Sequence, residues 1–252
     1  MGVNPGRVLI TGGTRGIGLA IAMEAVRHGA TVCVTHRWGS VAPEELDRLF
    51  ATEGLTAPRM EECDASVPDR NQALIGRLYS DWGGLDAIVS GVAFAAPVAD
   101  IRDLRRSSLE IALGYTAWPL LDLVQATLEH EVPPRRFLAL SSLGVERVLP
   151  GYEMVGISKA ALETLVRYLA ARLRPRGIAV NALRLGYIDT ESLRAVLPAE
   201  ASDVASRGGF MDPCIAARAA IALLSGLMDG MTGQVITVDQ GATLFPPFPM
   251  IS

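Results

Sequence analysis

Residues 7–29 read RVLITGGTRGIGLAIAMEAVRHG. The run at 7–11 is aliphatic and rich in β-branched residues, which is typical of a buried strand. Glycines then interrupt the apolar pattern, and from Ile17 apolar residues recur with helical spacing as far as Gly29, where a helix would end. The stretch therefore predicts a strand, a tight loop and a helix.

The same alternation repeats along the rest of the chain. Strands are expected at 30–35, 57–63, 85–90, 135–142, 177–184 and 234–239, and helices at 43–53, 67–81, 103–130, 151–174 and 212–225. Strands that alternate with helices pair in parallel through right-handed crossovers. The predicted fold is a Rossmann-type, doubly wound parallel α/β sheet that forms a single domain over residues 1–252.

One segment, at about 187–212, breaks this rhythm. It is rich in Ala, Ser and Gly around a weak helical pattern at 190–196. Long insertions on compact domains are often lids. We expect this segment to cover a bound molecule with Leu193, Val196, Leu197 and Phe210, unless these side chains simply pack on the body of the protein.

Composition excludes several classes of protein. The net charge of −4 with 20% charged residues provides no basic field for nucleic acid, so a small molecule is the expected partner. No apolar run reaches the roughly 18 residues that span a bilayer, and the N-terminus lacks a signal peptide, so we expect a cytoplasmic protein without membrane contact. Cys33, Cys63 and Cys214 lack Cys-x-x-Cys spacing and have apolar neighbours, which predicts buried thiols and neither a disulfide nor a metal site.

The glycine loop between the first strand and first helix lies where a doubly wound sheet binds a pyrophosphate. Gly12 allows the tight turn, Gly16 lets the backbone approach the phosphates, and Gly18 lets the helix pack closely on the strand. Thr14 and Ile17 complete the loop, and the helix N-terminus supplies free N–H groups for the anion. A glycine triplet alone indicates only a tight turn, but its position here favours a dinucleotide.

The end of the second strand indicates which dinucleotide. A site for NAD has a carboxylate there for the ribose 2′-hydroxyl, whereas this chain has His36 and Arg37, with Arg15 in the glycine loop. Two guanidinium groups suit a 2′-phosphate, so we expect NADPH, although both arginines could be solvated loop residues. Asp64, followed by Ala65 at the end of the third strand, is expected either to bond the adenine amino group or to cap the next helix.

The stretch 141–163 holds three candidate catalytic groups: an ammonium, a phenol and a hydroxyl. Lys159 is the only lysine in the chain, which indicates that arginine cannot replace it there; the alternative is a surface lysine. Tyr152 precedes it by seven residues and could be a phenol donor or a packing residue. Ser142 closes the fifth strand, where a hydroxyl can act on the phenol or satisfy the backbone.

In combination, T-G-x-x-x-G-x-G at 11–18, a serine closing the fifth strand and a lysine on the next helix resemble the short-chain dehydrogenase/reductase family. The resemblance extends across essentially the whole chain to Val-Asp-Gln-Gly at 238–241. The usual member has Tyr-x-x-x-Lys, but Val155 stands at that tyrosine position. The spacing Tyr152-x6-Lys159 is instead similar to that of the enoyl-acyl-carrier-protein reductases, and the surrounding residues resemble their NADPH-using branch.

This resemblance implies further cofactor contacts. Lys159 would hold the hydroxyls of the nicotinamide ribose. Gly186 and Thr190 match the family's Pro-Gly-x-x-x-Thr, with Leu185 in place of proline, and the backbone near Ile188 would approach the nicotinamide amide.

Two positions depart from the family pattern. Ser90 and Gly91, included here among the cofactor-binding residues, stand where the family has Asn-Asn, and Gly114 stands where a helical asparagine is usual. Ketoreductases use that helical asparagine in a proton relay. Its absence weakens a ketoreductase interpretation, although a chain that had lost activity would show the same change.

The shifted tyrosine is chemically reasonable for conjugate reduction. Hydride adds to the β-carbon of a 2-enoyl thioester while negative charge develops on an oxygen two carbons away. Moving the phenol three residues along a helix displaces it by about 4.5 Å. Tyr152 would then stabilise the enolate oxygen, and a neighbouring ammonium would make it a better donor.

The sequence thus predicts an NADPH-dependent reductase of the 2,3 double bond of an enoyl thioester, on an acyl carrier protein or coenzyme A, in fatty-acid or specialised acyl or polyketide biosynthesis. The alternatives are a carbonyl reductase of the 3-ketoacyl type and a non-catalytic NADP-binding subunit or sensor. Arg194 and Arg207 could receive an acidic carrier protein or could form a solvated face. The resemblance also implies a homodimer or homotetramer formed by the helices near 113–130 and 154–172.

Overall fold

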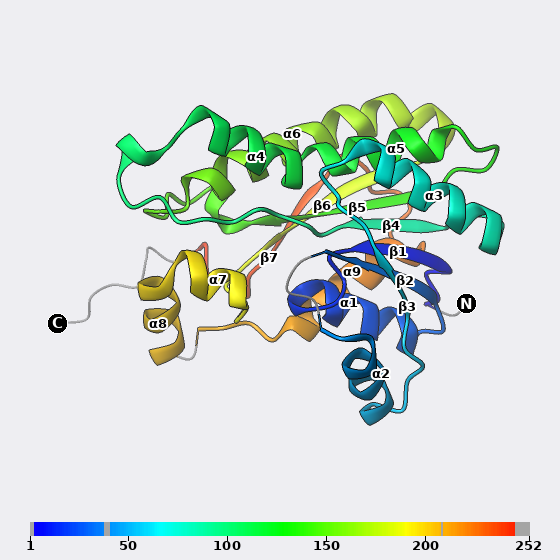
Figure 1. The fold of residues 1–252 in the computed structure, drawn as a ribbon, viewed down its shortest axis with the longest axis horizontal. Helices are drawn as coiled ribbons and strands as arrows, with labels where there is room; N and C mark the ends of the chain where they lie inside the picture. Colours follow the sequence, from blue (N-terminus) through cyan, green and yellow to red (C-terminus); the bar gives the residue numbers. More distant parts are fainter. Residues whose placement is uncertain (1–2, 38–40, 208, 245–252) are drawn as a thin grey trace.

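The computed structural model describes residues 3–37, 41–207 and 209–244, which form one doubly wound α/β domain (Figure 1). Seven parallel strands make its sheet, in the order β3-β2-β1-β4-β5-β6-β7. They are β1 Arg7–Thr11, β2 Thr31–His36, β3 Arg59–Glu62, β4 Ala87–Ser90, β5 Arg136–Ser142, β6 Ala179–Leu185 and β7 Val235–Val238. Every predicted strand is present, so the predicted fold class is confirmed.

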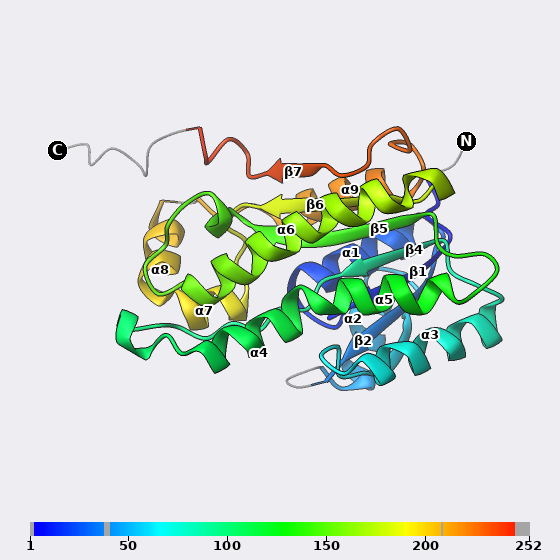
Figure 2. The same ribbon diagram turned by 90° about the horizontal axis from the view of Figure 1, so that it is seen from above.

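Helices cover both faces of the sheet. Helices α1 (Gly16–Arg27), α2 (Pro43–Thr52) and α9 (Pro213–Leu224) pack on one face, and α3 (Pro68–Trp82), α4 (Arg106–Thr116), α5 (Trp118–Leu128) and α6 (Glu153–Leu173) lie on the other (Figures 1 and 2). Each face buries its own apolar cluster because alternate residues of a strand point to opposite sides. Single-turn helices η1 (Ile101–Asp103), η2 (Leu143–Val145) and η3 (Arg174–Arg176) join these elements.

The strand order determines where a ligand-binding crevice forms at the edge of the sheet. The chain leaves β1 toward β2 on one side and reaches β4 on the other, so that Thr11 and Ser90 end neighbouring strands. The loops after these two strands diverge and leave a crevice at the carboxyl ends, where open α/β sheets bind ligands. Helices α7 (Glu191–Val196) and α8 (Pro198–Ser206) lie beyond this end of the sheet (Figure 1).

The predicted helix at 103–130 is divided into α4 and α5. Ala117 separates them, and Pro119 stands in the first turn of α5. Proline has no N–H to donate, and its ring clashes with the carbonyl oxygen four residues earlier. The apolar periodicity runs through both helices, so it predicted one continuous helix, whereas Pro119 causes a break between α4 and α5.

The segment at 187–212 also differs from expectation, because it contains two helices rather than one weak one. Thr190 caps α7 by accepting the N–H of Leu193, at 3.1 Å, and Pro198 begins α8. Val196 and Leu197 are buried where the two helices meet, so these two side chains pack on the protein, as the alternative interpretation had it.

The prediction of buried thiols is right for Cys33 and Cys63 and wrong for Cys214, which is exposed in the first turn of α9. Within the described ranges, no three His, Cys, Asp or Glu side chains lie close enough to hold a metal ion. In the same part of the chain, no helix combines the length and the apolar character needed to cross a bilayer.

Substitution of Phe137 tests how much the core beneath helices α3, α5 and α6 contributes to stability. It lies on β5, is 2% exposed, and belongs to the apolar cluster on that face. Phe137→Ala is expected to lower the free energy of unfolding by about 3–5 kcal/mol, because it removes apolar contacts and leaves a cavity. Val132→Ala, at a position that is 70% exposed, should change it by less than about 0.5 kcal/mol. Urea titration measures both, and equal losses would contradict this account of the core.

Candidate active site

The glycine loop joins β1 to α1 through a backbone that other residues could not follow. Gly12 and Gly16 have φ angles of 70° and 54°, in the region that favours glycine. A Cβ atom on Gly18 would lie 2.3 Å from the carbonyl oxygen of Gly12, so the first turn of α1 rests directly on the loop. Arg15, the N-cap residue of α1, makes no side-chain capping bond. The first N–H groups of α1 are therefore available to an anion.

A single cavity of about 510 Å³ extends from this loop to Tyr152. Except for Asp64 and Ser90, every residue predicted to bind cofactor or to act in catalysis lines it. The neighbours Ala65 and Gly91 do line it, so both strand ends still reach the cavity. The other walls include Phe94, Leu143 and Leu193, which make the Tyr152 end largely apolar.

Asp64 does not cap the next helix, and its bond to the adenine amino group stays a prediction. One carboxylate oxygen accepts hydrogen bonds from the backbone N–H and hydroxyl of Ser66, at 3.1 and 2.8 Å, and the other contacts Arg37. The N-cap residue of α3 is Val67, which has no side-chain capping bond. Asp64 therefore fixes the turn before α3 and holds a guanidinium group. No spacing pattern in the sequence predicts this ion pair, because the pair joins the ends of two separate strands.

The basic residues expected at a 2′-phosphate both lie at the cavity wall. Arg37 donates to the hydroxyl of Tyr115 at 2.9 Å, in addition to its ion pair with Asp64. Arg15 forms an exposed ion pair of 3.1 Å with Glu191 in the first turn of α7. Between them, the Nδ1 atom of His36 is buried without a hydrogen-bond partner. A buried polar atom of this kind calls for a partner, which a bound ligand can supply.

The loop after β4 also approaches the cavity closely. The Gly91 N–H donates to the Thr11 hydroxyl at 3.0 Å, and a Cβ atom on Gly91 would lie 2.6 Å from the Thr11 carbonyl oxygen. Ser90 lies beneath this contact, and its hydroxyl is buried without a partner. The glycine cradle, the available N–H groups of α1 and the orphaned His36 Nδ1 together fit a dinucleotide.

At the other end, the structure brings Ser142, Tyr152 and Lys159 together. The hydroxyl oxygens of Ser142 and Tyr152 are 3.1 Å apart. The Lys159 ammonium donates to the carbonyl oxygen of Leu140 at 2.6 Å, and this lysine is only 5% exposed. The lysine is thus not a surface residue, and the phenol is not merely a packing group.

Burial sets the ionisation of both residues. It raises the pKa of Tyr152, and the hydrogen bond between Tyr152 and Ser142 only partly opposes this effect. Tyr152 is therefore a neutral hydrogen-bond donor at neutral pH. Burial lowers the pKa of Lys159 to about 8, while the negative charge of Glu163 acts in the opposite direction. A Lys159 pKa this close to neutrality makes its protonation sensitive to its surroundings.

Two glycines explain how the phenol is placed. A Cβ atom on Gly144 would lie 2.4 Å from the ring of Tyr152, and one on Gly156 would lie 2.9 Å from the carbonyl oxygen of Gly144. Helix α6 and η2 can approach only because both positions lack a side chain. The sequence analysis did not identify Gly144 and Gly156 as part of the site, because their role depends on a contact between two separate segments.

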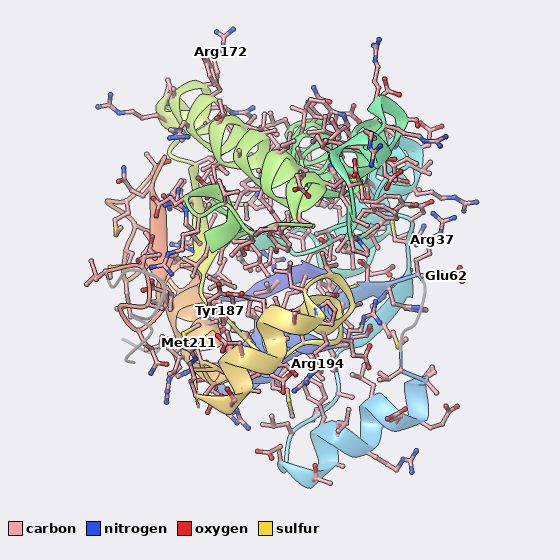
Figure 3. The ribbon with its side chains drawn as sticks, turned by 90° about the vertical axis from the view of Figure 1, so that its left-hand side faces the viewer. Arg37, Glu62, Arg172, Tyr187, Arg194 and Met211 are labelled. Carbon is pink, nitrogen blue, oxygen red and sulfur yellow. The ribbon has the colours of Figure 1, made fainter. Side chains whose placement is uncertain are left out.

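Tyr187 is another residue that sequence reasoning missed. It lines the cavity, and its hydroxyl donates to a carboxylate oxygen of Glu200 on α8 at 2.7 Å. Its carbonyl oxygen accepts the N–H of Met211 at 2.8 Å, and Figure 3 shows these two residues side by side. Burial, followed by the bond to Glu200, raises the pKa of Tyr187. These contacts join the two ends of the segment at 187–212 to each other at Tyr187, which lies in the cavity wall.

The two arginines considered for a carrier protein are engaged within this same segment. Arg194 forms a two-point ion pair with Asp189, at 2.6 and 2.7 Å, and lies over the ring of Phe210 at 5.7 Å (Figure 3). Arg207 pairs with Asp203 at 2.8 Å. Because all four charged groups are well exposed, these pairs contribute little to stability and can exchange partners.

Comparison with known proteins gives a consistent picture. The family described as enoyl-(acyl carrier protein) reductase matches residues 12–243. Enoyl-(acyl-carrier-protein) reductase (NADH) of Rickettsia bellii is 29% identical over 250 residues, which cover 93% of this chain and 92% of that protein. The 1-cyclohexenylcarbonyl-CoA reductase of Streptomyces collinus is 32% identical over 250 residues, with coverage of 95% and 88%. The crystal structure of enoyl-(acyl-carrier-protein) reductase (NADH) from Aquifex aeolicus matches with a TM-score of 0.84 at 28% identity, covering 98% of this chain and 99% of that one.

Gly18 provides a direct test of the dinucleotide end. Gly18→Ala places a methyl group against the Gly12 carbonyl oxygen and is expected to weaken NADPH binding by about tenfold or more, because α1 must move away from the loop. The matched control is Gly76→Ala on α3, where a Cβ atom would have nothing within 4 Å. It should leave NADPH affinity unchanged. Fluorescence titration with NADPH gives both values, and unaltered affinity in the Gly18 variant would remove the loop from the binding site.

Proposed function

The chain belongs to the enoyl-(acyl carrier protein) reductase family of short-chain dehydrogenases/reductases, and from this premise we propose that it reduces the 2,3 double bond of an enoyl thioester with NADPH. The observation that carries the proposal is the 3.1 Å contact between the Tyr152 and Ser142 hydroxyls, with buried Lys159 in the same cavity. A neutral phenol and an ammonium group at one end of a dinucleotide cleft are what hydride transfer to a conjugated thioester requires.

Each residue has a separate task in this reaction. The glycine loop and Lys159 would hold the cofactor, which when bound would supply a hydride to the β-carbon of the thioester. As the double bond electrons move toward the thioester carbonyl, Tyr152 donates a hydrogen bond to the oxygen on which negative charge develops. Ser142 fixes the direction of that phenol. Lys159 holds the ribose hydroxyls of the cofactor, and a proton then adds to the α-carbon to complete the reduction.

NADPH is part of the proposal, although the relatives from Rickettsia bellii and Aquifex aeolicus carry NADH in their names. The support is chemical. The second strand ends in His36 and Arg37, a position where a carboxylate would repel a 2′-phosphate. Arg37 is held by Asp64, which also orients it before any ligand arrives. A phosphate carries more negative charge than this carboxylate and competes favourably for the guanidinium group.

We also propose that α7 and α8 form the lid over the acyl group, with Leu193 of α7 already at the cavity wall. The carrier is an acyl carrier protein or coenzyme A, in fatty-acid or specialised acyl biosynthesis. The likeness to a reductase named for 1-cyclohexenylcarbonyl-CoA supports the inclusion of coenzyme A thioesters and cyclic acyl groups. The exposed ion pairs of Arg194 and Arg207 leave both guanidinium groups able to meet an acidic carrier.

A homodimer or homotetramer completes the proposal. Large apolar side chains on α4, α5 and α6 are exposed in the single chain, with Ile111, Trp118 and Ile157 close to half exposed and Tyr168 71% exposed. Their exposure is consistent with an interface formed by these helices.

Tyr152→Phe tests the reaction itself. Removing the hydroxyl is expected to lower kcat on a 2-enoyl thioester by about 10²–10³, because the developing charge loses its donor, while NADPH affinity stays unchanged. Tyr79→Phe is the control: Tyr79 lies on α3 away from the cavity, its hydroxyl donates to the Val132 carbonyl oxygen at 2.9 Å, and the variant should be fully active. Oxidation of NADPH is followed at 340 nm with a 2-enoyl and, separately, a 3-ketoacyl thioester. Turnover of the ketone alone would indicate a carbonyl reductase, and NADPH binding without turnover of either would indicate a binding subunit.

Arg37→Ala tests the choice of cofactor. We expect the affinity for NADPH to fall about tenfold or more, since a two-point bond to the phosphate is lost, while the affinity for NADH changes by less than about threefold. Arg48→Ala is the control, because Arg48 lies on the exposed side of α2 and donates to the Glu44 carbonyl oxygen. A parallel loss for both cofactors would show that Arg37 does not read the 2′-phosphate.

A further inference from the structure

The last three residues of β5 each hold one group of helix α6. The Leu140 carbonyl oxygen accepts from the Lys159 ammonium at 2.6 Å. The Ser141 hydroxyl donates to a carboxylate oxygen of Glu163 at 2.7 Å, and the Ser142 hydroxyl meets that of Tyr152 at 3.1 Å. Two of these three contacts involve the proposed catalytic groups. The middle one, to Glu163, has no role in the reaction described so far.

Glu163 is an unusual residue for the inside of a protein. It is 1% exposed, and both carboxylate oxygens accept hydrogen bonds from Arg184 on β6, at 2.9 and 2.6 Å. Arg184 also contacts the carboxylate of Glu146, which is about half exposed. Removing two charges from water costs several kcal/mol for each ion, so a buried pair of this kind is weak support for stability. Its place next to the site indicates another role.

That role follows from the position of Glu163 relative to Lys159. The two residues are four apart on α6, so their side chains leave the same face of the helix. Burial lowers the pKa of Lys159 to about 8, and Glu163 is the charged group that opposes this effect. Glu163 therefore stabilises the charged form of the lysine in a place where water cannot.

Other charged and titratable groups on the elements around Lys159 do not take this part. Arg184 on β6 and Glu146 after η2 belong to the Glu163 network, and Tyr152 stays neutral because burial raises its pKa. The remaining groups lie on the packed helices α4 and α5, on α6 itself, after η2, on η3 and along the cavity wall after β6. They are Arg106, Glu110, Tyr115, Asp122, Arg147, Glu153, Arg167, Tyr168, Arg172, Arg174, Arg176, Tyr187, Asp189 and Glu191. Among all these groups, Glu163 is the one whose charge raises the pKa of Lys159.

We propose that Glu163 is a positioning residue, which keeps Lys159 protonated and holds the end of β5 so that this ammonium faces the cofactor. The inference rests on the proposed role of Lys159 as the cofactor anchor. The hydrogen bond from Ser141 to Glu163 holds the end of β5 against α6. Arg184 fixes the position of the Glu163 carboxylate through two hydrogen bonds. Glu163 contacts neither cofactor nor substrate.

Glu163→Gln is the decisive variant, because glutamine keeps the size and hydrogen bonding of the side chain and loses its charge. The dissociation constant of NADPH is measured by fluorescence between pH 6 and 9. In the unaltered protein, affinity should fall as pH rises through about 8, where Lys159 loses its proton. In the variant this fall should occur about one pH unit lower or more, while at pH 6 the two affinities agree within about threefold.

Two controls separate the possible causes. Glu146→Gln neutralises the exposed carboxylate on the same arginine and should leave the fall near pH 8 in place. Glu163→Asp retains the charge and should restore most of the wild-type profile. Identical profiles for the wild type and Glu163→Gln, or an equal shift in Glu146→Gln, would overturn the assignment.

Lys159→Gln distinguishes failure of this inference from failure of the proposed function. If its NADPH affinity equals that of the wild type at pH 6, Lys159 is not the anchor and both proposals fall. If its affinity is lower but Glu163→Gln keeps the wild-type profile, only the role of Glu163 falls. Should Glu163→Gln not fold because Arg184 loses its buried partner, the double variant Glu163→Gln/Arg184→Gln removes both charges. A smaller shift in the same direction, toward lower pH, is then expected, because the loss of the Arg184 charge partly offsets the loss of the Glu163 charge.

Discussion

The hydrogen bond between the Lys159 ammonium and the Leu140 carbonyl oxygen joins helix α6 to a central strand of the sheet. In a parallel sheet all carboxyl ends lie along one edge, so the position of β5 is fixed by β4 on one side and β6 on the other. The ammonium is thereby held by the most constrained part of the fold. Tyr152, the N-cap residue of the same helix, is held against the end of β5 by its hydrogen bond with Ser142.

The dinucleotide end is built on a different principle. There the cavity wall is formed mainly by backbone atoms. Gly18 and Gly91 allow main-chain segments to approach each other closely and leave space for a ligand. Charge is arranged more loosely, as the Arg15 pair with Glu191 is exposed. Arg15 belongs to the glycine loop and Glu191 to the first turn of α7, so this exposed ion pair joins the loop to the segment at 187–212.

Local sequence patterns were sufficient for most of the fold and for the residues that surround the cleft. Strand periodicity, the glycine spacing and the solitary lysine each reflect a requirement within a few residues of the chain. What they could not reveal depends on contacts between distant segments. The ion pair of Asp64 with Arg37 and that of Glu163 with Arg184 join separate strands and helices, and no spacing rule predicts them. The division between α4 and α5 was readable in principle from Pro119, but a strong apolar periodicity outweighed that single residue.

The presence of a single lysine also determines how the protein reacts with reagents that modify amines. Every other side-chain base apart from histidine is arginine, whose guanidinium group does not act as a nucleophile near neutral pH. Lys159 is buried, and its pKa of about 8 leaves an appreciable fraction of free amine in mildly alkaline solution. Acylating reagents directed at amines consequently find no side-chain target on the outside of the molecule. Apart from the chain terminus, covalent labelling of this protein through an amine reports on the interior of one cleft.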